Sequence, residues 1–212
     1  MLSGHCHYCC MFGVLTPIKE ASLSTRHNGN CMIMANLAQG EPIAGYGLTA
    51  RLFHWLTAIL VLVQIPLGIL VTNFDLGALY SLHKSNGVLI LAVVICRLLW
   101  RMTHQPPPLS SDIPAIQRLA AHSVHWALYA LLIIQPIVGW IATSAYPAPV
   151  PFFGLFEMPP IWWADRALSE RLFVVHLGIG IVMAGLLAAH IGAALFHHFV
   201  RKDAVLDRMI RG

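Results

Sequence analysis

Charged side chains are scarce in this chain of 212 residues. Only 10% of the residues are Asp, Glu, Lys or Arg, whereas soluble domains contain about 25%. Hydrophobic residues make up 58% of the chain, and the mean hydropathy is +0.70. This composition excludes an ordinary soluble domain and predicts an integral membrane protein surrounded by lipid. The net charge of +4 therefore does not indicate a nucleic-acid partner, and we expect it to mark one side of the membrane.

Cysteine is also scarce in the apolar part of the chain, where only Cys96 is present. Four of the five cysteines precede residue 32, and the fifth, Cys96, lies in an apolar segment. This arrangement does not resemble a disulfide framework. The run from His5 to Cys10 contains ligands for a soft metal. We nevertheless interpret residues 1–44 as a disordered N-terminal extension or the product of a start codon assigned too early, with Met32 and Met34 as alternative starts.

Long apolar segments dominate the rest of the chain. Each is long enough to cross a bilayer, which takes about 20 apolar residues. We therefore predict an all-α membrane protein, with a bundle of four transmembrane helices over residues 45–202 and a cytoplasmic C-terminal tail over residues 203–212. The four predicted spans are Leu48–Val71, Leu82–Met102, Arg118–Ser144 and Leu172–Val200.

The links between the spans differ in composition. The link Thr103–Gln117 is rich in proline, which predicts an extended backbone. The link Tyr146–Glu170 has five prolines and the pair Trp162-Trp163, so we expect an aromatic cap at the membrane interface.

Lysine and arginine are distributed unevenly between the two predicted membrane sides. Four spans place both termini on the same side as Thr103–Gln117. Ten basic residues fall on that side and three on the other, which predicts cytoplasmic termini. The ten are Lys19, Arg26, Arg51, Arg97, Arg101, Arg118, Arg201, Lys202, Arg208 and Arg211, and the three are Lys84, Arg166 and Arg171.

Histidine is abundant for a membrane protein, with 12 residues. His176 and His190 lie about 21 Å apart on nearly the same face of the fourth span. Polar residues within a span usually face a partner inside the bundle. His83 shares the depth of His176, and His54 shares that of His190. Two depth-matched pairs are thus predicted, one near each membrane surface.

A pair of imidazoles on facing helices suits the iron of haem b. Two strong axial ligands leave no open position, which favours electron transfer. A zinc site would need ligands that converge on a tetrahedron, often with Cys or carboxylate. A single buried histidine is more often hydrogen-bonded than ligating, but two matched pairs favour two haems. His122 and His125 remain rival ligands at the cytoplasmic level.

Glycines along the fourth span have two interpretations. They can clear space for a flat ring or allow close packing between helices, and both remain open. The residues are Gly178, Gly180, Gly185 and Gly192.

A weak internal repeat relates the first two spans to the last two. It predicts two helical hairpins related by an axis along the membrane normal, although chance similarity of apolar helices is the alternative. The aligned pairs are His54/His125, Gln64/Gln135, Gly68/Gly139, His83/His176, Gly87/Gly180 and Arg97/His190. Arg97 then occupies the position of a ligand without being one. It could contact a haem propionate or a quinone oxygen, or simply lie at a helix end.

The chain resembles the bacterial di-haem cytochrome b561 family of four-helix inner-membrane proteins. The resemblance covers about residues 48–212 and rests on Arg51–Trp55, Leu82–Gly87, Arg97–Arg101, Ala121–His125, the spacing of His176 and His190, His197–Asp203 and Arg208-Met209. It implies that His54, His83, His176 and His190 are axial ligands of two haem b groups. It also implies ubiquinone as a redox partner, with His197 near the quinone. Some members resemble superoxide oxidase, which passes electrons from periplasmic superoxide to ubiquinone.

The leading hypothesis is transmembrane electron transfer from superoxide to ubiquinone. The basic residues Lys84, Arg166 and Arg171 would attract an anion, although acidic residues on the same side oppose this. His197 or His198 could relay protons to the quinone, or could simply end the helix. One alternative is a cytochrome b subunit that serves a dehydrogenase, a hydrogenase or a soluble carrier, and another is a histidine-lined proton or metal transporter. A homo-oligomer or a redox partner protein also remains open.

Overall fold

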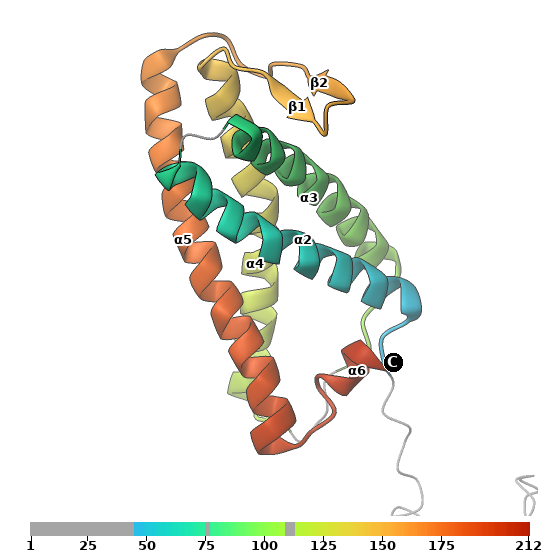
Figure 1. Ribbon diagram of the computed structural model, residues 1–212. Coiled ribbons are helices and arrows are strands. Elements are labelled where there is room, and N and C mark those ends of the chain that lie inside the picture. Colours follow the sequence, from blue (N-terminus) through green and yellow to red (C-terminus); the bar gives the residue numbers. More distant parts are fainter. Residues whose placement is uncertain (1–44, 75–76, 109–112) are drawn as a thin grey trace, which may run out of the picture. The chain divides into compact units, whose positions relative to one another are not determined.

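The structure is a computed structural model that describes residues 45–74, 77–108 and 113–212. The predictions made for residues 1–44 lie outside the described residues. Among these described residues there are four long helices, and each is long and apolar enough to cross a membrane. They are α2 (Leu48–Asn73), α3 (Gly77–Thr103), α4 (Ala115–Ala145) and α5 (Arg166–Phe196) (Figure 1). The prediction of four membrane-spanning helices is confirmed.

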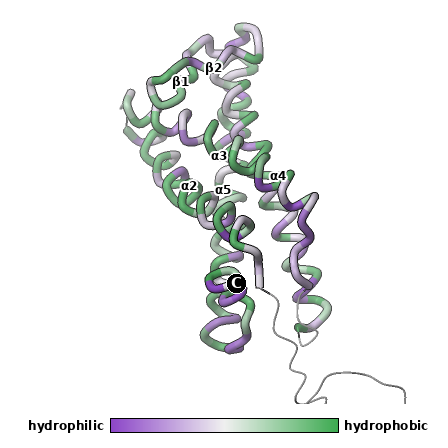
Figure 2. The backbone as a smooth tube through the Cα atoms, turned by 90° about the vertical axis from the view of Figure 1, so that its right-hand side faces the viewer, coloured by the Kyte–Doolittle hydropathy of each residue, from purple (hydrophilic) through white to green (hydrophobic). Residues whose placement is uncertain are grey.

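The helices pack as two antiparallel hairpins. Helix α2 lies against α3, α4 lies against α5, and α3 joins the two hairpins by packing against α4. A small buried core holds this interface together, made of Val61, Ile90, Val94, Tyr129, Leu132 and Met183. Most other large apolar side chains are exposed, and hydrophobic residues follow the helices along their length (Figure 2). Such outward-facing surfaces suit lipid rather than water.

Helix α5 begins earlier than the sequence suggests. It starts at Arg166 rather than Leu172, because the side chain of Asp165 caps it by accepting a hydrogen bond of 3.0 Å from the Leu168 N–H. An N-cap of this kind satisfies one of the free donors of the first turn. The helix continues into a π-helical turn, η1 (His197–Arg201). Lys202 then takes a left-handed conformation, with φ of 54°, and ends it.

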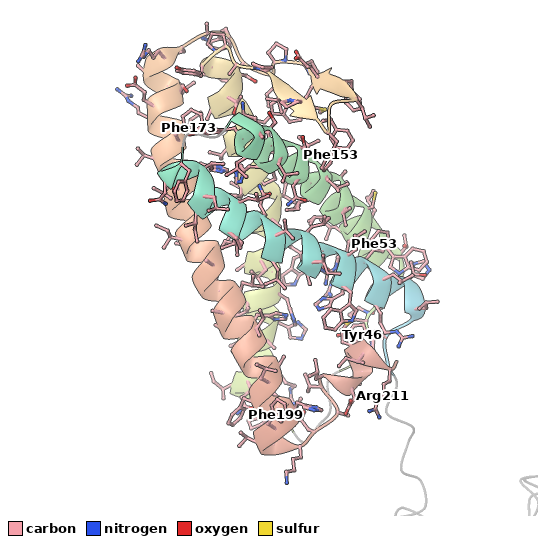
Figure 3. The ribbon with its side chains drawn as sticks, viewed as in Figure 1. Tyr46, Phe53, Phe153, Phe173, Phe199 and Arg211 are labelled. Atoms are coloured by element: carbon pink, nitrogen blue, oxygen red, sulfur yellow. The ribbon has the colours of Figure 1, made fainter. Side chains whose placement is uncertain are left out.

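A β-hairpin that the sequence did not predict lies in the link between α4 and α5. It consists of β1 (Val150–Phe152) and β2 (Phe156–Met158), and it packs on α3 (Figure 1). The buried hydroxyl of Ser85 holds it, lying 2.9 Å from the Pro151 carbonyl and accepting the Phe153 N–H at 2.9 Å. The Lys84 ammonium donates to the Pro149 carbonyl at 3.0 Å. We call this end of the bundle the hairpin end (Figure 3).

The last residues fold back on the opposite end of the bundle, which we call the C-terminal end. A short helix, α6 (Asp207–Ile210), lies beside the start of α2 (Figure 1). The Arg51 guanidinium donates to the Ile210 carbonyl at 2.9 Å, and the Trp55 indole donates to the Met209 carbonyl at 3.1 Å. The segment predicted as a tail is therefore fixed to the helix that carries His54.

Candidate functional site

Two histidines face each other near the hairpin end. His83 lies on α3 and His176 on α5, and the centres of their rings are 6.1 Å apart. Both side chains are partly buried. The depth argument had predicted this pair, and the structure brings it together across the two hairpins.

A glutamine on the neighbouring helix holds the backbone at each of these histidines. The Gln64 amide donates to the His83 carbonyl at 3.0 Å, and the Gln135 amide donates to the His176 carbonyl at 2.8 Å. Because the same contact recurs at aligned positions, the structure agrees with the internal repeat. The sequence had marked both glutamines as part of the repeat but had assigned them no role.

A glycine lies against each of these histidine rings. A Cβ atom at Gly68 would stand 3.4 Å from His83 Cε1, and one at Gly139 would stand 2.9 Å from His176 Cε1. The rings therefore occupy space that a side chain would fill. The glycines of α5 divide differently, since a Cβ at Gly180 would meet the Gln135 amide at 3.2 Å whereas positions 178, 185 and 192 face open space.

The two rings differ in their hydrogen bonds. His176 Nδ1 lies 3.1 Å from the backbone carbonyl of Gln135. A carbonyl can only accept, so Nδ1 carries the proton and Nε2 has a free lone pair. His83 Nδ1 is buried and has no hydrogen-bond partner among the described residues, although His83 Nε2 lies 3.4 Å from the Gln64 amide.

Three histidines gather toward the C-terminal end. His190 of α5 lies with its ring centre 6.2 Å from that of His54 on α2 and 5.1 Å from that of His125 on α4. His122, the other rival, is exposed and makes no such ring contact within the described part of the chain. The three imidazoles do not form a single ion site, since no three His, Cys, Asp or Glu side chains of residues 45–74, 77–108 and 113–212 converge in that way.

Arg97 completes this group. Its Nη2 lies 3.0 Å from His54 Nδ1, and its Cζ lies 5.2 Å from the centre of the Tyr129 ring. In the structure the Arg97 guanidinium lies against a candidate ligand, and its contact with a haem propionate or a quinone, one of the interpretations left open by the sequence, stays a prediction. The internal repeat indicates this contact. His54 aligns with His125 and Arg97 aligns with His190, and His125 and His190 are also in contact.

A second polar group lies where α5 ends. His197 Nδ1 is 2.6 Å from Asp203 Oδ2, and Arg201 Nε is 3.4 Å from the same oxygen. The left-handed Lys202 turns the chain so that Asp203 can reach back to His197. The sequence placed Asp203 in the same motif as His197, but it did not identify the two residues as partners. The neighbouring His198 instead packs against Phe199, with ring centres 4.8 Å apart.

Comparison with known protein families identifies the family to which this chain belongs. The model of a family described as prokaryotic cytochrome b561 matches residues 45–212, which include all four helices and both groups of histidines. The chain belongs to the prokaryotic cytochrome b561 family. As a member it is a multi-pass membrane protein of electron transfer, and the family implies that it binds haem b.

Named relatives of this cytochrome b561 are found in Escherichia coli and Yersinia pestis. It is 36% identical over 171 residues to cytochrome b561 homolog 2 of Escherichia coli, covering 78% of this chain and 90% of the relative. It is 28% identical over 170 residues to cytochrome b561 homolog 1 of the same organism, covering 78% and 96%. It is also 32% identical over 161 residues to a protein of Yersinia pestis named probable superoxide oxidase CybB, covering 74% and 90%.

Proposed function

We propose that this cytochrome b561 carries electrons across the bacterial inner membrane through two b-type haems. His83 and His176 hold the haem at the hairpin end, and His54 and His190 hold the haem at the C-terminal end. Superoxide donates electrons at the hairpin end, and ubiquinone accepts them at the C-terminal end. Both termini are cytoplasmic in this proposal, which rests on the ten basic residues against three counted above.

One observation carries the proposal, the spacing of the two imidazole pairs. Metal–imidazole bonds are about 2 Å long, so two such bonds plus the distance from each nitrogen to its ring centre span roughly 6 Å. The ring centres of His83 and His176 are 6.1 Å apart, and those of His54 and His190 are 6.2 Å apart. The separation of 5.1 Å between His125 and His190 is too short for the same arrangement. The pairing therefore favours His54 over His125 as the partner of His190.

The hydrogen bonds at the hairpin end also fit a haem ligand. The lone pair of His176 Nε2 is available to a metal because the Nδ1–H of the same ring is bound by the Gln135 carbonyl. Partners of this kind fix the orientation of a ligating imidazole and raise its basicity. His83 Nδ1 is buried and has no hydrogen-bond partner among the described residues. Buried polar atoms normally have a partner, so the protein contacts alone leave this ring incompletely satisfied. A haem with two imidazole ligands supplies one-electron transfer without an open position for oxygen.

The charges at the hairpin end do not form a strongly basic surface. Its described residues include three basic side chains, but Arg166 pairs with Glu170 at 3.0 Å, and Lys84 donates to the Pro149 carbonyl. Glu157 and Asp165 add negative charge at the same end. The proposal of superoxide therefore rests on the relative named probable superoxide oxidase and on the small size of the donor. No protein nucleophile or acid is needed for a one-electron step.

The C-terminal end offers a proton carrier beside the proposed quinone site. Reduction of a quinone to a quinol consumes two protons. His197 is held by Asp203 through Nδ1, which leaves Nε2 free to give a proton to a quinone oxygen and to regain one from solvent. A carboxylate behind a histidine fixes the tautomer and the orientation of the ring.

Reaction of the purified protein with superoxide tests this function. The haem-loaded protein in lipid nanodiscs is mixed with superoxide in a stopped-flow spectrometer, with and without ubiquinone. We expect superoxide to reduce the b-type haems and ubiquinone to reoxidise them, with both steps followed by the haem absorbance. The variant His83→Ala should lose fast reduction by superoxide, whereas His122→Ala, at an exposed histidine, should retain it.

Two results would change the conclusion. If superoxide reduces the protein no faster than it reduces free haem, the donor is a partner protein, and the cytochrome serves a dehydrogenase or another carrier. If the purified protein is colourless and gains no haem on reconstitution, a transporter role is favoured instead.

A further inference from the structure

A strained turn forms the tip of the β-hairpin between α4 and α5. The Leu155 N–H donates to the Phe152 carbonyl at 2.9 Å, so Phe153 and Gly154 are the two central residues of this turn. Both have positive φ, 49° at Phe153 and 72° at Gly154. Positive φ at both central positions is the requirement of a type I′ turn and favours Asn followed by Gly. A bulky residue in this conformation is strained, so the chain has phenylalanine where the backbone favours asparagine.

The side chains at this tip are large, apolar and exposed. Phe153 is 46% exposed, Leu155 is 77% exposed and Phe156 is 54% exposed. No charged residue occurs from Tyr146 to Phe156. Strained residues persist where their surroundings favour them, and apolar side chains are favoured where they leave water. The strain at Phe153 is therefore offset if the tip has apolar surroundings.

The hairpin lies at the level of the membrane border. It binds α3 through Lys84 and Ser85, which are about 10–12 Å along the helix from its first residue, Gly77. Helix α3 has 27 residues and is therefore about 40 Å long, whereas the hydrocarbon core of a bilayer is about 30 Å thick. The first turns of α3, with the hairpin beside them (Figure 1), thus lie where the headgroups meet the acyl chains.

The hairpin is attached to the lipid-facing side of α3. Ala92, Cys96 and Leu99 follow Ser85 on one side of the helix, at about 100° per residue. All three are exposed. Ser85 lies on the same side but is buried, because the hairpin backbone covers it. The tip therefore stands over the side of α3 that contacts lipid further along the helix, and Phe153 lies beside α3 there (Figure 3).

The backbone of the hairpin is suited to this depth. A free N–H or C=O group is costly away from water. The Phe153 N–H donates to the Ser85 hydroxyl, and the Leu155 N–H is bonded within the turn. Pro149 and Pro151 have no N–H to satisfy, and their carbonyls are bound by side chains of α3. The proline-rich sequence therefore removes donors where water is scarce.

We propose that the hairpin tip, formed by Phe153, Leu155 and Phe156, is an anchor that inserts into the lipid leaflet at the hairpin end. Aromatic side chains favour the border between headgroups and acyl chains, and Leu155 adds apolar area. Lipid is thus the partner of this surface. The anchor also holds the link beside His83, because the hairpin backbone binds Ser85 on the same helix. The inference depends on the membrane spans and not on the roles of the histidines.

Spin labelling of the full chain in lipid nanodiscs tests the anchor. The natural cysteines are replaced by alanine, and Leu155→Cys carries a nitroxide. Oxygen concentrates in lipid, whereas a nickel chelate stays in water, so the ratio of their collision rates with the nitroxide reports its depth. We expect this ratio to exceed several-fold the ratio at Glu170→Cys, an exposed position near the start of α5. It should approach the ratio at Ile95→Cys, an exposed position within α3.

Substitutions at the strained position test whether Phe153 itself anchors the tip. Phe153→Asn supplies the residue that the turn geometry favours, so the hairpin should stay folded. We expect it to lower the oxygen-to-nickel ratio of the nitroxide at position 155, because a buried amide group is costly in lipid and the tip moves toward water. Phe153→Trp keeps a large aromatic side chain and is the matched control, in which the ratio should not change.

Three results would overturn the inference. A ratio at position 155 equal to that at position 170 would place the tip in water. Low collision rates with both reagents at position 155 would show that protein covers the tip, either a partner or a second copy of this chain. An unchanged or raised ratio in Phe153→Asn would show that Phe153 does not anchor it. These outcomes do not depend on haem or superoxide, so failure of the anchor is distinct from failure of the proposed electron transfer.

Discussion

Replacing Gly139 with alanine should displace the candidate ligand His176. The added Cβ would stand 2.9 Å from His176 Cε1 and 3.1 Å from Nδ1, whereas ordinary contacts begin at 3.4 Å. The ring must therefore retreat by about 0.5 Å (3.4 − 2.9). Metal–ligand distances tolerate only about 0.2 Å, so the imidazole can no longer meet both the metal and the Gln135 carbonyl.

The size of the effect follows from the cost of overpacking. Crowding a well-packed site costs about 1–3 kcal/mol, which corresponds to a loss of haem affinity at the hairpin end of roughly 5- to 150-fold. Alanine is a better helix former than glycine by about 1 kcal/mol. The helix itself should therefore stay folded, and the loss should appear in haem binding rather than in helix content.

The repeat supplies a matched control. A Cβ at Gly68 would stand 3.4 Å from His83 Cε1, which is an ordinary contact. Gly68→Ala should then bind haem as the wild type does. Both variants are purified in detergent, and haem per chain is measured by the pyridine haemochrome absorbance, with helix content followed by circular dichroism. Full haem occupancy with an unchanged spectrum in Gly139→Ala would refute the reasoning, as would an equal loss in Gly68→Ala.

Three further substitutions test other parts of the structure. Ser85→Ala leaves backbone groups of the β-hairpin without their partner, which costs about 1–3 kcal/mol, and limited proteolysis should cut this link faster. Asp203→Asn removes the carboxylate behind His197, so ubiquinone should reoxidise the haems more slowly at unchanged haem content in the stopped-flow assay. Trp55→Phe removes the indole donor to α6, worth about 1 kcal/mol, and hydrogen exchange in residues 207–210 should rise.

Each of these has a control at a related position. Ser81→Ala changes an exposed serine that bonds only within its own helix, and it should not increase proteolysis. Asp207→Asn alters a partly exposed carboxylate 4.0 Å from Arg211, and quinone reduction should not slow. Trp126→Phe changes the repeat equivalent of Trp55, and exchange in α6 should stay the same. A variant that behaves like its control would show that the assigned contact has no role.

The membrane helices were predictable because one physical requirement dominates them. A segment in lipid must satisfy its own backbone hydrogen bonds and expose apolar side chains, so long apolar runs reveal both the number and the depth of the spans. Depth in turn predicted which histidines could meet, and His83 does face His176 while His54 faces His190. The start of α5 was misplaced because a charged first turn, capped by Asp165, extends beyond the apolar run.

The contacts that the sequence missed depend on side chains brought together by tertiary packing. The β-hairpin forms in a link rich in proline because Ser85 and Lys84 of α3 bind its backbone, and no local pattern encodes that support. Arg97 was recognised as the odd member of the repeat, but only the packing of α2 against α3 puts its guanidinium on His54. The pairing of Asp203 with His197 requires the left-handed turn at Lys202.

Haem stoichiometry in single histidine variants tests the central claim most directly, namely that four histidines hold two haems. We predict two haems per wild-type chain by pyridine haemochrome and one haem per chain when any of the four proposed ligands is changed to alanine. We also predict that His125→Ala keeps both. A single haem in the wild type, or loss of a haem in His125→Ala while His54→Ala retains two, would contradict it.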